Sequence, residues 1–495
     1  MAYIKKKTKM KNIFNKTLLA VATAVAFGTT GCNKIKDFED TNVNPNGTPT
    51  PVTGALFTRA IAELGGRENG LAISAYTRPG YYAQFFAETQ YPEASLYGVP
   101  QLEFHQNYSG FLMDLQNVLL FNTSEETKQA VAVSGSNANQ IATARILKAY
   151  AFWTITDRWG DVPYSEALKG VENFLPKYDT QEEIYASLLT ELKEAVDGFD
   201  NGFGMSGDVI YKGANAKWQK FANSLRMQIA LRMSKVYPNA GGLAATEFAA
   251  ALSHPAGTIS TNADNAKIDF PGGAYQNPWY VSYVTNSRID DAVSSTITDK
   301  LSDFNDPRIS RFGTSTTGFP YGLDRPHAIT VPSGWGLILD GQSISDAEDV
   351  VIMNAATVLF ARAEAAELGW TSEDPAALYN QAVTASLDQW GYGSQSAAYL
   401  GHPSVSFGTE DHLEKIGTQK WIALYPDGMQ AWAEWRRTGF PVLTPAEYAS
   451  NSTGEIPRRF VYGTNEYGTN NENVKAAAAR LQGGDTQDSR MWWDK

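Results

Sequence analysis

Hydrophobic side chains recur at helical spacing in several long stretches of the chain. The clearest stretch is residues 180–198, where hydrophobic residues stand at every fourth position and so share one face of a helix. The residues of this face are Ile184, Leu188, Leu192 and Val196. Thr180 stands before them and Glu183 lies three residues further on, which is the capping-box pattern. The sequence therefore predicts a helix whose N-cap is Thr180.

The same spacing predicts other helices, and some of them form pairs. These helices span residues 140–158, 216–236, 350–370, 374–390, 412–425 and 428–439. Two pairs stand out: 140–158 with 180–198, and 350–370 with 374–390. Helical pairs with small residues at their crossing are typical of tetratricopeptide-type units. Because the pairs are far apart in the sequence, we expect a mostly α fold in which they form one scaffold, not a regular solenoid.

Two long segments, about 66–110 and about 254–345, break the helical pattern. Both are rich in Gly, Pro, Asn, Ser, Thr and aromatic residues. Loops of this length are uncommon in compact domains unless they carry a function. We therefore expect a single helical domain over residues 51–495, with these two insertions carrying the binding surface.

The N-terminal segment has the features of a secretory signal. Lysines between Lys5 and Lys16 precede an apolar run over 18–27, which is too short to span a bilayer as a stable helix, and small residues lead to Cys32. This arrangement resembles a bacterial lipoprotein signal, which implies that residues 1–31 are removed and that the Cys32 thiol carries lipid. The alternative is a free cysteine buried in the core, but a residue so close to a signal peptide has no core to join.

The composition of the segment after Cys32 predicts a tether and indicates where the protein is located in the cell. Residues 32–50 are polar, acidic and rich in Asn, Pro and Gly, so we expect a flexible tether. An acidic run close behind a lipidated cysteine resembles the export signal that sends some lipoproteins to the outer face of the outer membrane. The prediction is a lipid-anchored outer-membrane protein that faces the cell exterior. A solvated linker is the alternative interpretation of these charges.

Charge and cysteine content narrow the class of protein. Removing residues 1–31 takes away six lysines and no acidic residue, so the net charge falls from −12 to −18. A chain this acidic is not expected to bind nucleic acid. No second run of about 18 or more apolar residues follows, so we expect the lipid to be the only membrane anchor. Because Cys32 is the only cysteine, the core must hold the fold without disulfides.

A series of motifs resembles one family. Residues 157–164, DRWGDVPY, closely resemble the hallmark of the SusD/RagB-like outer-membrane nutrient-binding lipoproteins. Similar motifs occur in family order along most of the chain, the first of them before the hallmark and the others after it: TNVNPN, PKYDTQEEIYASLL, KWQKFANSLRMQIALRMS, NDPRI, ARAEAAELGW, QKWIALY, EWRRTGFP, IPRRFVY and the terminal WWD. Many weak motifs in one order are far more specific than any one of them. Gly463 departs from the pattern, since members often have Pro after the Tyr.

The resemblance implies a fold, a role and a partner. The fold would be tetratricopeptide-like helical pairs decorated by loops. The role would be that of a non-catalytic cell-surface lipoprotein that captures a nutrient, most often a glycan. The partner would be a SusC-like TonB-dependent outer-membrane transporter, which receives the nutrient. No cofactor is implied.

Much of the hallmark is interpreted as structural. Three of its residues are expected to pack at a helix exit: Trp159, Pro163 and Tyr164. Arg436 and Arg437 are expected to pair with acids such as Glu434, as structural ion pairs do.

The loop segments hold side chains that suit a glycan. A sugar offers apolar C–H faces, which match Trp and Tyr rings, and hydroxyl groups, which Asn, Asp, Gln and Arg can satisfy. The candidate ligand-binding residues are Trp279, Tyr280, Tyr97, Trp335, Tyr91, Tyr283, Asn277, Arg288 and Asp290. We expect the first four of them to be exposed. For any one of them alone, packing in the core or pinning a loop is the stronger interpretation.

Motifs of other function classes are missing from the sequence. It contains no P-loop, no G-x-S-x-G and no dinucleotide fingerprint, and its five histidines show no metal spacing. The segment SDFNDPR is rich enough in oxygen ligands for a structural Ca²⁺, although no EF-hand pattern is present.

Other functions stay open at this point. A surface glycoside hydrolase is one, because 53 carboxylates always leave possible acid pairs. A receptor for a non-glycan nutrient such as a peptide is another, since peptides also stack on Trp and Tyr. A solute receptor for an ATP-driven importer is disfavoured, because that class usually alternates strand and helix.

Overall fold

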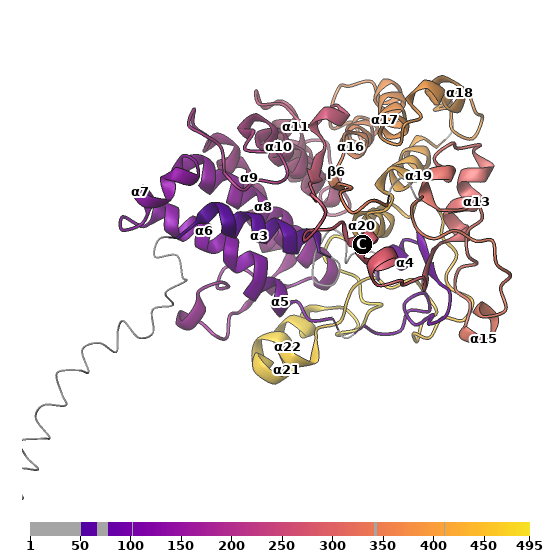
Figure 1. Ribbon diagram of the computed structural model, residues 1–495, viewed down its shortest axis with the longest axis horizontal. Coiled ribbons are helices and arrows are strands. Elements are labelled where there is room, and N and C mark those ends of the chain that lie inside the picture. Colours follow the sequence, from indigo (N-terminus) through magenta and orange to yellow (C-terminus); the bar gives the residue numbers. More distant parts are fainter. Residues whose placement is uncertain (1–50, 67–77, 101, 341–343, 410) are drawn as a thin grey trace, which may run out of the picture. The chain divides into compact units, whose positions relative to one another are not determined.

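Helices dominate the computed structural model, which describes residues 51–66, 78–100, 102–340, 344–409 and 411–495 (Figure 1). The longer helices are α3 (Thr53–Gly65), α6 (Met113–Thr123), α8 (Asn137–Trp159), α9 (Gln181–Asp197), α10 (Asn215–Arg232), α11 (Leu243–Leu252), α13 (Ser295–Asp303), α16 (Ala355–Glu367), α17 (Pro375–Gln389), α19 (His412–Leu424), α20 (Gly428–Thr438) and α22 (Asn471–Arg480). The shorter ones are α4 (Pro79–Tyr82), α5 (His105–Asn107), α7 (Lys128–Val131), α12 (Pro278–Tyr280), α14 (Ile309–Phe312), α15 (Arg325–Ala328), α18 (Ser396–Leu400) and α21 (Thr464–Thr469). The predicted mostly α fold is confirmed. The predicted signal peptide, lipidated Cys32 and tether lie outside the described residues.

The predicted helical pairs are present. Helix α8 packs against α9, and α16 packs against α17; α10 and α11 form a further pair. The capping box of α9 is complete, because the Thr180 hydroxyl accepts from the backbone N–H of Glu183 while the Glu183 carboxylate accepts from the backbone N–H of Thr180. The predicted apolar face of α9 is buried. Local sequence pattern therefore determines where this helix begins and which face it buries.

The prediction of a helix over residues 350–370 is wrong at its start. Val350–Met353 form strand β6, which pairs antiparallel with β4 (Ala266–Ile268). Helix α16 begins only after Asn354, whose side chain accepts a hydrogen bond from the backbone N–H of Thr357. A short apolar run with three β-branched residues suits a buried strand as well as a helix, and periodicity alone does not separate the two.

Two further pairs of strands join distant segments. Strand β1 (Phe86–Glu88) pairs antiparallel with β5 (Asp291–Val293), and β2 (Val162–Pro163) pairs with β3 (Tyr178–Asp179). The first of these ladders connects the two segments that were expected to be insertions. Those segments also contain helices, among them α4, α12 and α13, so they are less irregular than their composition suggests.

Aromatic packing holds the end of α8. Trp159 is buried, and its ring meets Phe460 edge-on with 5.2 Å between the centroids. Gly160 then adopts a φ of 86°, which side-chain-bearing residues disfavour, and the chain turns into β2. Pro163 is buried in β2, and the ring of Tyr164 packs edge-on against an aromatic ring of α8. The structural interpretation of these hallmark residues is confirmed.

A cluster of buried charged side chains, the buried charge network, connects α8, α10, α16, α19 and α20. Its members are Asp157, Glu364, Glu434, Arg232, Lys420 and Arg437. Glu434 lies 2.6 Å from Arg437, 2.9 Å from Lys420 and 3.1 Å from Arg232. Arg437 also binds Glu364, and Arg232 also binds Asp157. Burial by itself would raise the pKa of Glu434, but the three cations hold it well below its usual range.

The prediction for the two arginines of α20 is half confirmed. Arg437 pairs with Glu434 as expected. Arg436 does not: its guanidinium lies over the Trp432 ring, 3.6 Å from the centroid, and donates to the Asp157 carbonyl at 2.8 Å. The helical period explains the difference, because a residue three positions after Glu434 shares its face whereas the residue two positions after it points elsewhere.

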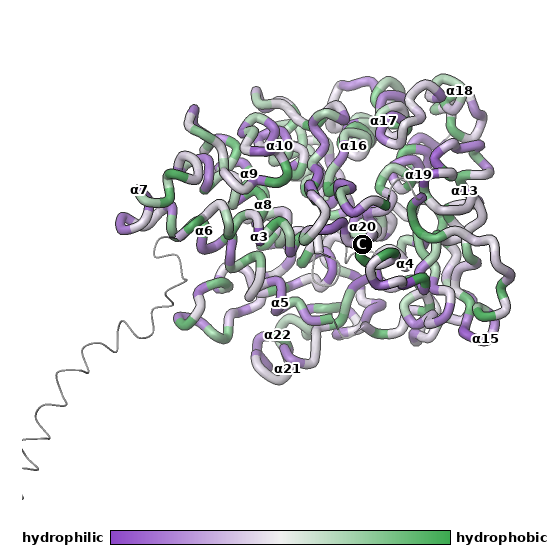
Figure 2. The backbone as a smooth tube through the Cα atoms, in the orientation of Figure 1, coloured by the Kyte–Doolittle hydropathy of each residue, from purple (hydrophilic) through white to green (hydrophobic). Residues whose placement is uncertain are grey.

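Figure 2 shows hydrophobic and hydrophilic positions mixed along the helices. Such mixing is the pattern of helices that bury one face against their neighbours. In the part of the chain that the structure describes, no helix has both the length and the apolar character needed to cross a membrane.

Removing one charge from the buried charge network is expected to destabilise the domain strongly. Glu434→Gln would leave two carboxylates facing three buried cations, and breaking a buried pair typically costs about 3–5 kcal/mol. Urea unfolding of the variant and the parent chain measures this loss. The matched control is Glu125→Gln, because Glu125 pairs with Lys128 at 2.6 Å but is 83% exposed, so the midpoint should hardly move. Equal effects of the two substitutions would contradict the importance of the network.

Candidate functional site

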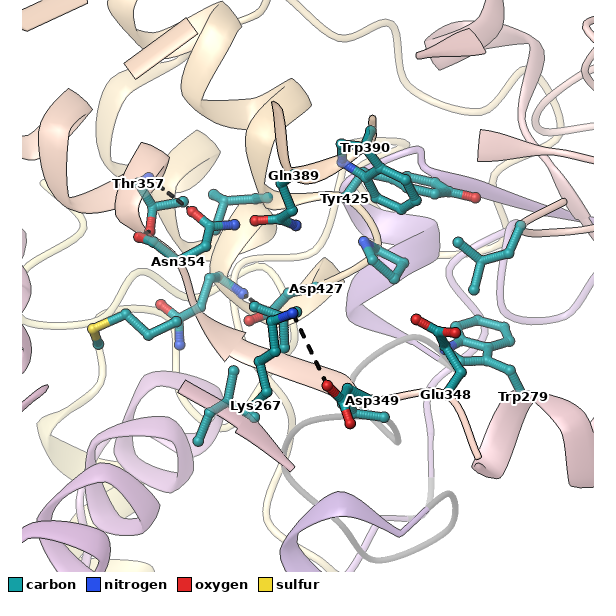
Figure 3. A pocket seen from close by; sticks show the side chains of 18 of the residues that line it. Lys267, Trp279, Glu348, Asp349, Asn354, Thr357, Gln389, Trp390, Tyr425 and Asp427 are labelled. Carbon is teal, nitrogen blue, oxygen red and sulfur yellow. Dashed lines mark hydrogen bonds and ion pairs between the residues drawn. The ribbon is translucent and has the colours of Figure 1, made fainter. Parts of the chain in front are cut away.

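A cavity of about 160 Å³ lies beside strand β6 (Figure 3). Its walls come from segments far apart in the sequence: β4, β6, α12, the end of α17 and the turn between α19 and α20. Four aromatic side chains line it: Trp153, Trp279, Trp390 and Tyr425. The polar lining includes Lys267, Glu348, Asp349, Asn354, Thr357, Gln389 and Asp427.

The aromatic walls are held by packing from behind. Tyr425 stacks on Phe312 with 4.1 Å between the ring centroids and 11° between the ring planes. Trp390 meets the Phe312 ring edge-on, with 4.9 Å between the centroids. Trp279 stacks on Tyr283 with the centroids 6.1 Å apart. Rings fixed in this way offer a flat apolar surface that does not need to be ordered when a ligand binds.

Asn277 sets the position of Trp279. Its Oδ1 accepts hydrogen bonds from the backbone N–H groups of Trp279 at 2.8 Å and Tyr280 at 3.3 Å. Its Nδ2 donates to the carbonyl of Glu348 at 2.8 Å. Asn277 therefore caps α12 and ties it to the segment that leads into β6. Figure 3 shows the result, with the Trp279 ring and the Glu348 carboxylate side by side at one end of the cavity.

The polar side of the cavity carries charge. Lys267 lies 4.0 Å from the carboxylate of Asp349, as Figure 3 shows. Burial raises the pKa of Asp349. Burial also raises the pKa of Glu348, and the neighbouring charge of Asp349 adds to that shift. The cations around these two carboxylates therefore do not fully compensate for their lost hydration.

Asp427 caps α20 at the cavity wall. Its Oδ1 accepts a hydrogen bond from the backbone N–H of Gln430 at 3.1 Å. Burial raises the pKa of Asp427 to about 7, and the hydrogen bonds from Gln430 and Met429 oppose this shift only in part. Near neutral pH the carboxyl group is thus divided between its protonated and ionised forms.

Two buried hydrogen-bond donors in the cavity lining have no partner in the part of the chain that the structure describes. Neither Nε1 of Trp390 nor Nε2 of Gln430 has a hydrogen-bond partner among the described residues. A buried donor left unsatisfied costs about 1–3 kcal/mol. An oxygen-rich ligand in the cavity would supply the acceptors that these two groups lack.

Comparison with known proteins gives the family. A protein-family model described as "Starch-binding associating with outer membrane" matches residues 45–463. The chain belongs to this SusD-like family. The family is associated with the outer membrane. No curated protein matches the chain.

Several solved structures share the SusD-like fold. A SusD homologue from Bacteroides uniformis is 27% identical, with a TM-score of 0.78 over 90% of this chain and 99% of that one. A chitin-binding SusD homologue from Flavobacterium johnsoniae is 25% identical, with a TM-score of 0.74 over 90% and 98% of the two chains. A SusD homologue from Bacteroides fragilis, 22% identical with a TM-score of 0.75 over 90% and 100%, supports the fold alone. The tetratricopeptide-like architecture predicted from the helical pairs is confirmed.

Two of the predicted binding residues, Trp279 and Asn277, line the cavity of this SusD-like chain. The expectation that Trp279 is exposed is wrong, because only 3% of its surface is accessible. The same expectation is wrong for Tyr97, which is fully buried. The Tyr97 hydroxyl accepts from the backbone N–H of Ala446 at 2.8 Å, and its ring packs against Tyr82 at 6.0 Å. Tyr97 therefore belongs to the core and lies outside the cavity lining, and a ligand-binding role for it stays a prediction.

The other predicted aromatic residues lie outside the cavity lining. Tyr91 is 55% exposed, and the guanidinium of Arg325 lies over its ring at 5.2 Å. Trp335 is half-buried and meets Phe319 edge-on at 5.4 Å. Tyr280 is half-buried in α12. A ligand-binding role for these three residues stays a prediction.

The remaining predicted residues already have partners within the chain. Arg288 donates from Nε to the carboxylate of Asp290 at 2.6 Å. Tyr283 stands behind the cavity wall, where its hydroxyl donates to the Asp291 carbonyl and accepts from the backbone N–H of Ile338, both at 3.2 Å. These contacts hold loops together, and a role in binding stays a prediction for all three residues.

Most of the polar lining was not predictable from local patterns. Lys267, Glu348 and Asp349 lie on or next to short strands whose pairing brings them together. Trp390 and Tyr425 follow the last residues of two helices and directly precede Gly and Pro. An aromatic residue at a helix end before such a chain-breaking residue is the one sequence signal that points to these walls.

The segment predicted to suit Ca²⁺ has its main carboxylate already bound. Asp306 is buried, and its Oδ1 accepts from Nε of Arg308 at 2.9 Å. A calcium ion bound by Asp306 would have to displace the Arg308 guanidinium. A structural Ca²⁺ in this segment stays a prediction.

Asp427→Asn is expected to gain stability, relative to the parent chain, as the pH rises. The folded-state pKa of about 7 lies above the ordinary value of 3.8. Between these values the folded chain binds more protons than the unfolded one, so Asp427 lowers the free energy of unfolding as the pH rises from 4 to 7. Asparagine keeps the capping oxygen and does not ionise.

Urea unfolding at several pH values measures this difference. Asp411→Asn is the matched control, because it changes the same kind of cap at the exposed start of α19. If the difference in free energy of unfolding between Asp427→Asn and the parent chain were constant from pH 4 to 7, that result would contradict the raised pKa of Asp427.

Proposed function

We propose that this chain is a non-catalytic cell-surface lipoprotein that captures a glycan and delivers it to a SusC-like TonB-dependent transporter. The cavity beside β6 is the observation that carries the binding half of this proposal. Family membership, together with the likeness to a chitin-binding homologue, supports a glycan as the ligand class.

The chemistry of the cavity suits a sugar. The rings of Trp279, Trp390 and Tyr425 match the C–H faces of a pyranose. The unpartnered donors of Trp390 and Gln430 suit ring or hydroxyl oxygens, whereas Gln389 and the carboxylates suit hydroxyl donors. The cavity is smaller than the roughly 300–1,000 Å³ of pockets that enclose drug-sized ligands, so we infer that it holds one ring or one end of a glycan.

Glycan binding by this cavity is tested on native gels cast with soluble polysaccharides, amylopectin and glycol chitin among them. The chain from Asn33 onward is expected to be retarded by at least one of them. Trp279→Ala and Gln389→Ala should each weaken binding by about tenfold or more, equivalent to about 1.4 kcal/mol, because one removes a wall and the other removes a polar contact. Gln389→Ala also serves as the variant that spares the aromatic packing.

The matched control is Tyr275→Ala, since Tyr275 is 65% exposed on the same segment as Trp279 and does not line the cavity. Retardation that survives both cavity variants but is lost in Tyr91→Ala or Trp335→Ala would place the site on the exposed aromatic residues. Retardation by none of the polysaccharides would contradict a polymeric glycan as cargo. Release of reducing ends during long incubation would contradict the non-catalytic role.

The anchor and the partner are tested together in intact outer membranes. Detergent extraction is expected to yield the chain in a complex with a large barrel protein, because the proposed role requires delivery to a transporter. Cys32→Ala is expected to move the chain out of the membrane fraction, because several acyl chains hold firmly where an unmodified tether does not. A clean monomer from the parent membranes would count against the partner, and membrane retention of Cys32→Ala would count against the lipid.

A further inference from the structure

A second cluster of polar side chains lies away from the cavity. It consists of Glu103, His105 and Glu466, each of which offers one ligand atom within 4.8 Å of the other two. His105 begins α5, Glu103 stands two positions before it, and Glu466 lies in α21; Figure 1 shows α5 and α21 as neighbours. None of the three lines the cavity beside β6. The cluster therefore joins two segments that are more than 350 positions apart in the sequence.

Glu103 is only half satisfied by the protein. Its Oε1 accepts a hydrogen bond from the backbone N–H of Asn465 at 3.2 Å. Its Oε2 is buried and has no hydrogen-bond partner among the described residues; Nδ1 of His105 lies 3.8 Å away. A carboxylate oxygen removed from water in this way needs a cation to compensate it.

Gly463 makes room for this carboxylate. A Cβ atom added at Gly463 would overlap the carboxyl group of Glu103. The φ of Gly463 is −66°, which any residue adopts, so glycine is required here for close approach and not for backbone freedom. The backbone therefore brings Glu103 into the cluster at a position where every other residue would push it out.

Glu466 brings a second carboxylate into the same place. It is buried, and one of its oxygens accepts from the hydroxyl of Tyr178. Two carboxylates this close repel each other, and either a shared proton or a cation between them removes that repulsion. The side chain of His105 is 46% exposed, so its imidazole is free to turn toward that point.

We propose that Glu103, His105 and Glu466 bind a divalent transition-metal ion of the zinc class. Imidazole nitrogen and carboxylate oxygen are ligands that Zn²⁺ takes at about 2.0–2.2 Å, which places tetrahedral ligand atoms ~3.4 Å apart. The 3.8 Å between Nδ1 of His105 and Oε2 of Glu103 is already close to that spacing. Ca²⁺ takes oxygen ligands only, so the imidazole selects against it. The bound ion would tie the start of α5 to α21.

The test is calorimetric titration of ZnCl₂ into the metal-stripped mature chain in detergent, followed by thermal unfolding with and without the ion. One equivalent is expected to bind and to raise the unfolding temperature. His105→Ala and Glu103→Gln should each weaken binding by at least tenfold, and Gly463→Ala should do the same without removing a ligand. CaCl₂ should leave the unfolding temperature unchanged. Circular dichroism confirms that each variant is folded.

The matched control is His327→Ala. His327 also pairs with a carboxylate, that of Asp324, but it is 57% exposed and belongs to no cluster of three metal-ligating residues among those described. It should leave the zinc affinity unchanged. Equal losses in His105→Ala and His327→Ala would show non-specific surface binding and overturn the proposal. The proposal would also be overturned if the metal-stripped chain bound no zinc and His105→Ala still lowered its stability. In that case a protonated imidazole would be the cation that compensates the carboxylates.

Discussion

The buried charge network is the constraint on which the rest of the domain depends. Three carboxylates and three cations are removed from water between five helices. Each buried ion loses several kcal/mol of hydration, so the arrangement is tolerated only while every charge keeps its partners. Because most partners come from different helices, sliding one helix along its axis would separate at least one pair. We infer that the network selects a single register for the helical scaffold, which apolar packing alone specifies less strictly.

The same network forms the floor of the cavity. Lys420 and Glu434 belong to both, and Gln430 stands one turn before Glu434 on α20. Gln430 accepts from Arg232 at 3.0 Å, so one end of its amide is fixed by the network while its nitrogen is left for the cavity. Polar groups held in place before a ligand arrives lose little conformational entropy on binding. If the cavity binds a glycan as proposed, the scaffold would contribute to recognition by keeping these polar groups ordered before the ligand arrives.

Sequence patterns predicted the features that local forces determine. The capping box at Thr180 and the pairing of Glu434 with Arg437 each join residues three positions apart, and both are correct. The bond from Arg437 to Glu364 spans 73 positions, and no local pattern announces it. Tyr97 shows the same limit for binding residues. A tyrosine in a polar, glycine-containing segment has the composition of an exposed loop, and only distant segments folding over it make it part of the core.

The cavity takes its distinctive groups from the segments with the weakest periodicity. Glu348 and Asp349 precede β6, while Trp390 and Tyr425 follow helix ends, and none of them belongs to the buried charge network. Substitutions at these positions would change the cavity without disturbing the pairs that fix the scaffold. The fold and the cargo are therefore separable, and likeness to a chitin-binding homologue constrains the architecture more tightly than the ligand. Under the proposed function, the rings, the unpartnered donors and the incompletely compensated carboxylates of this cavity would select the cargo within the SusD-like fold.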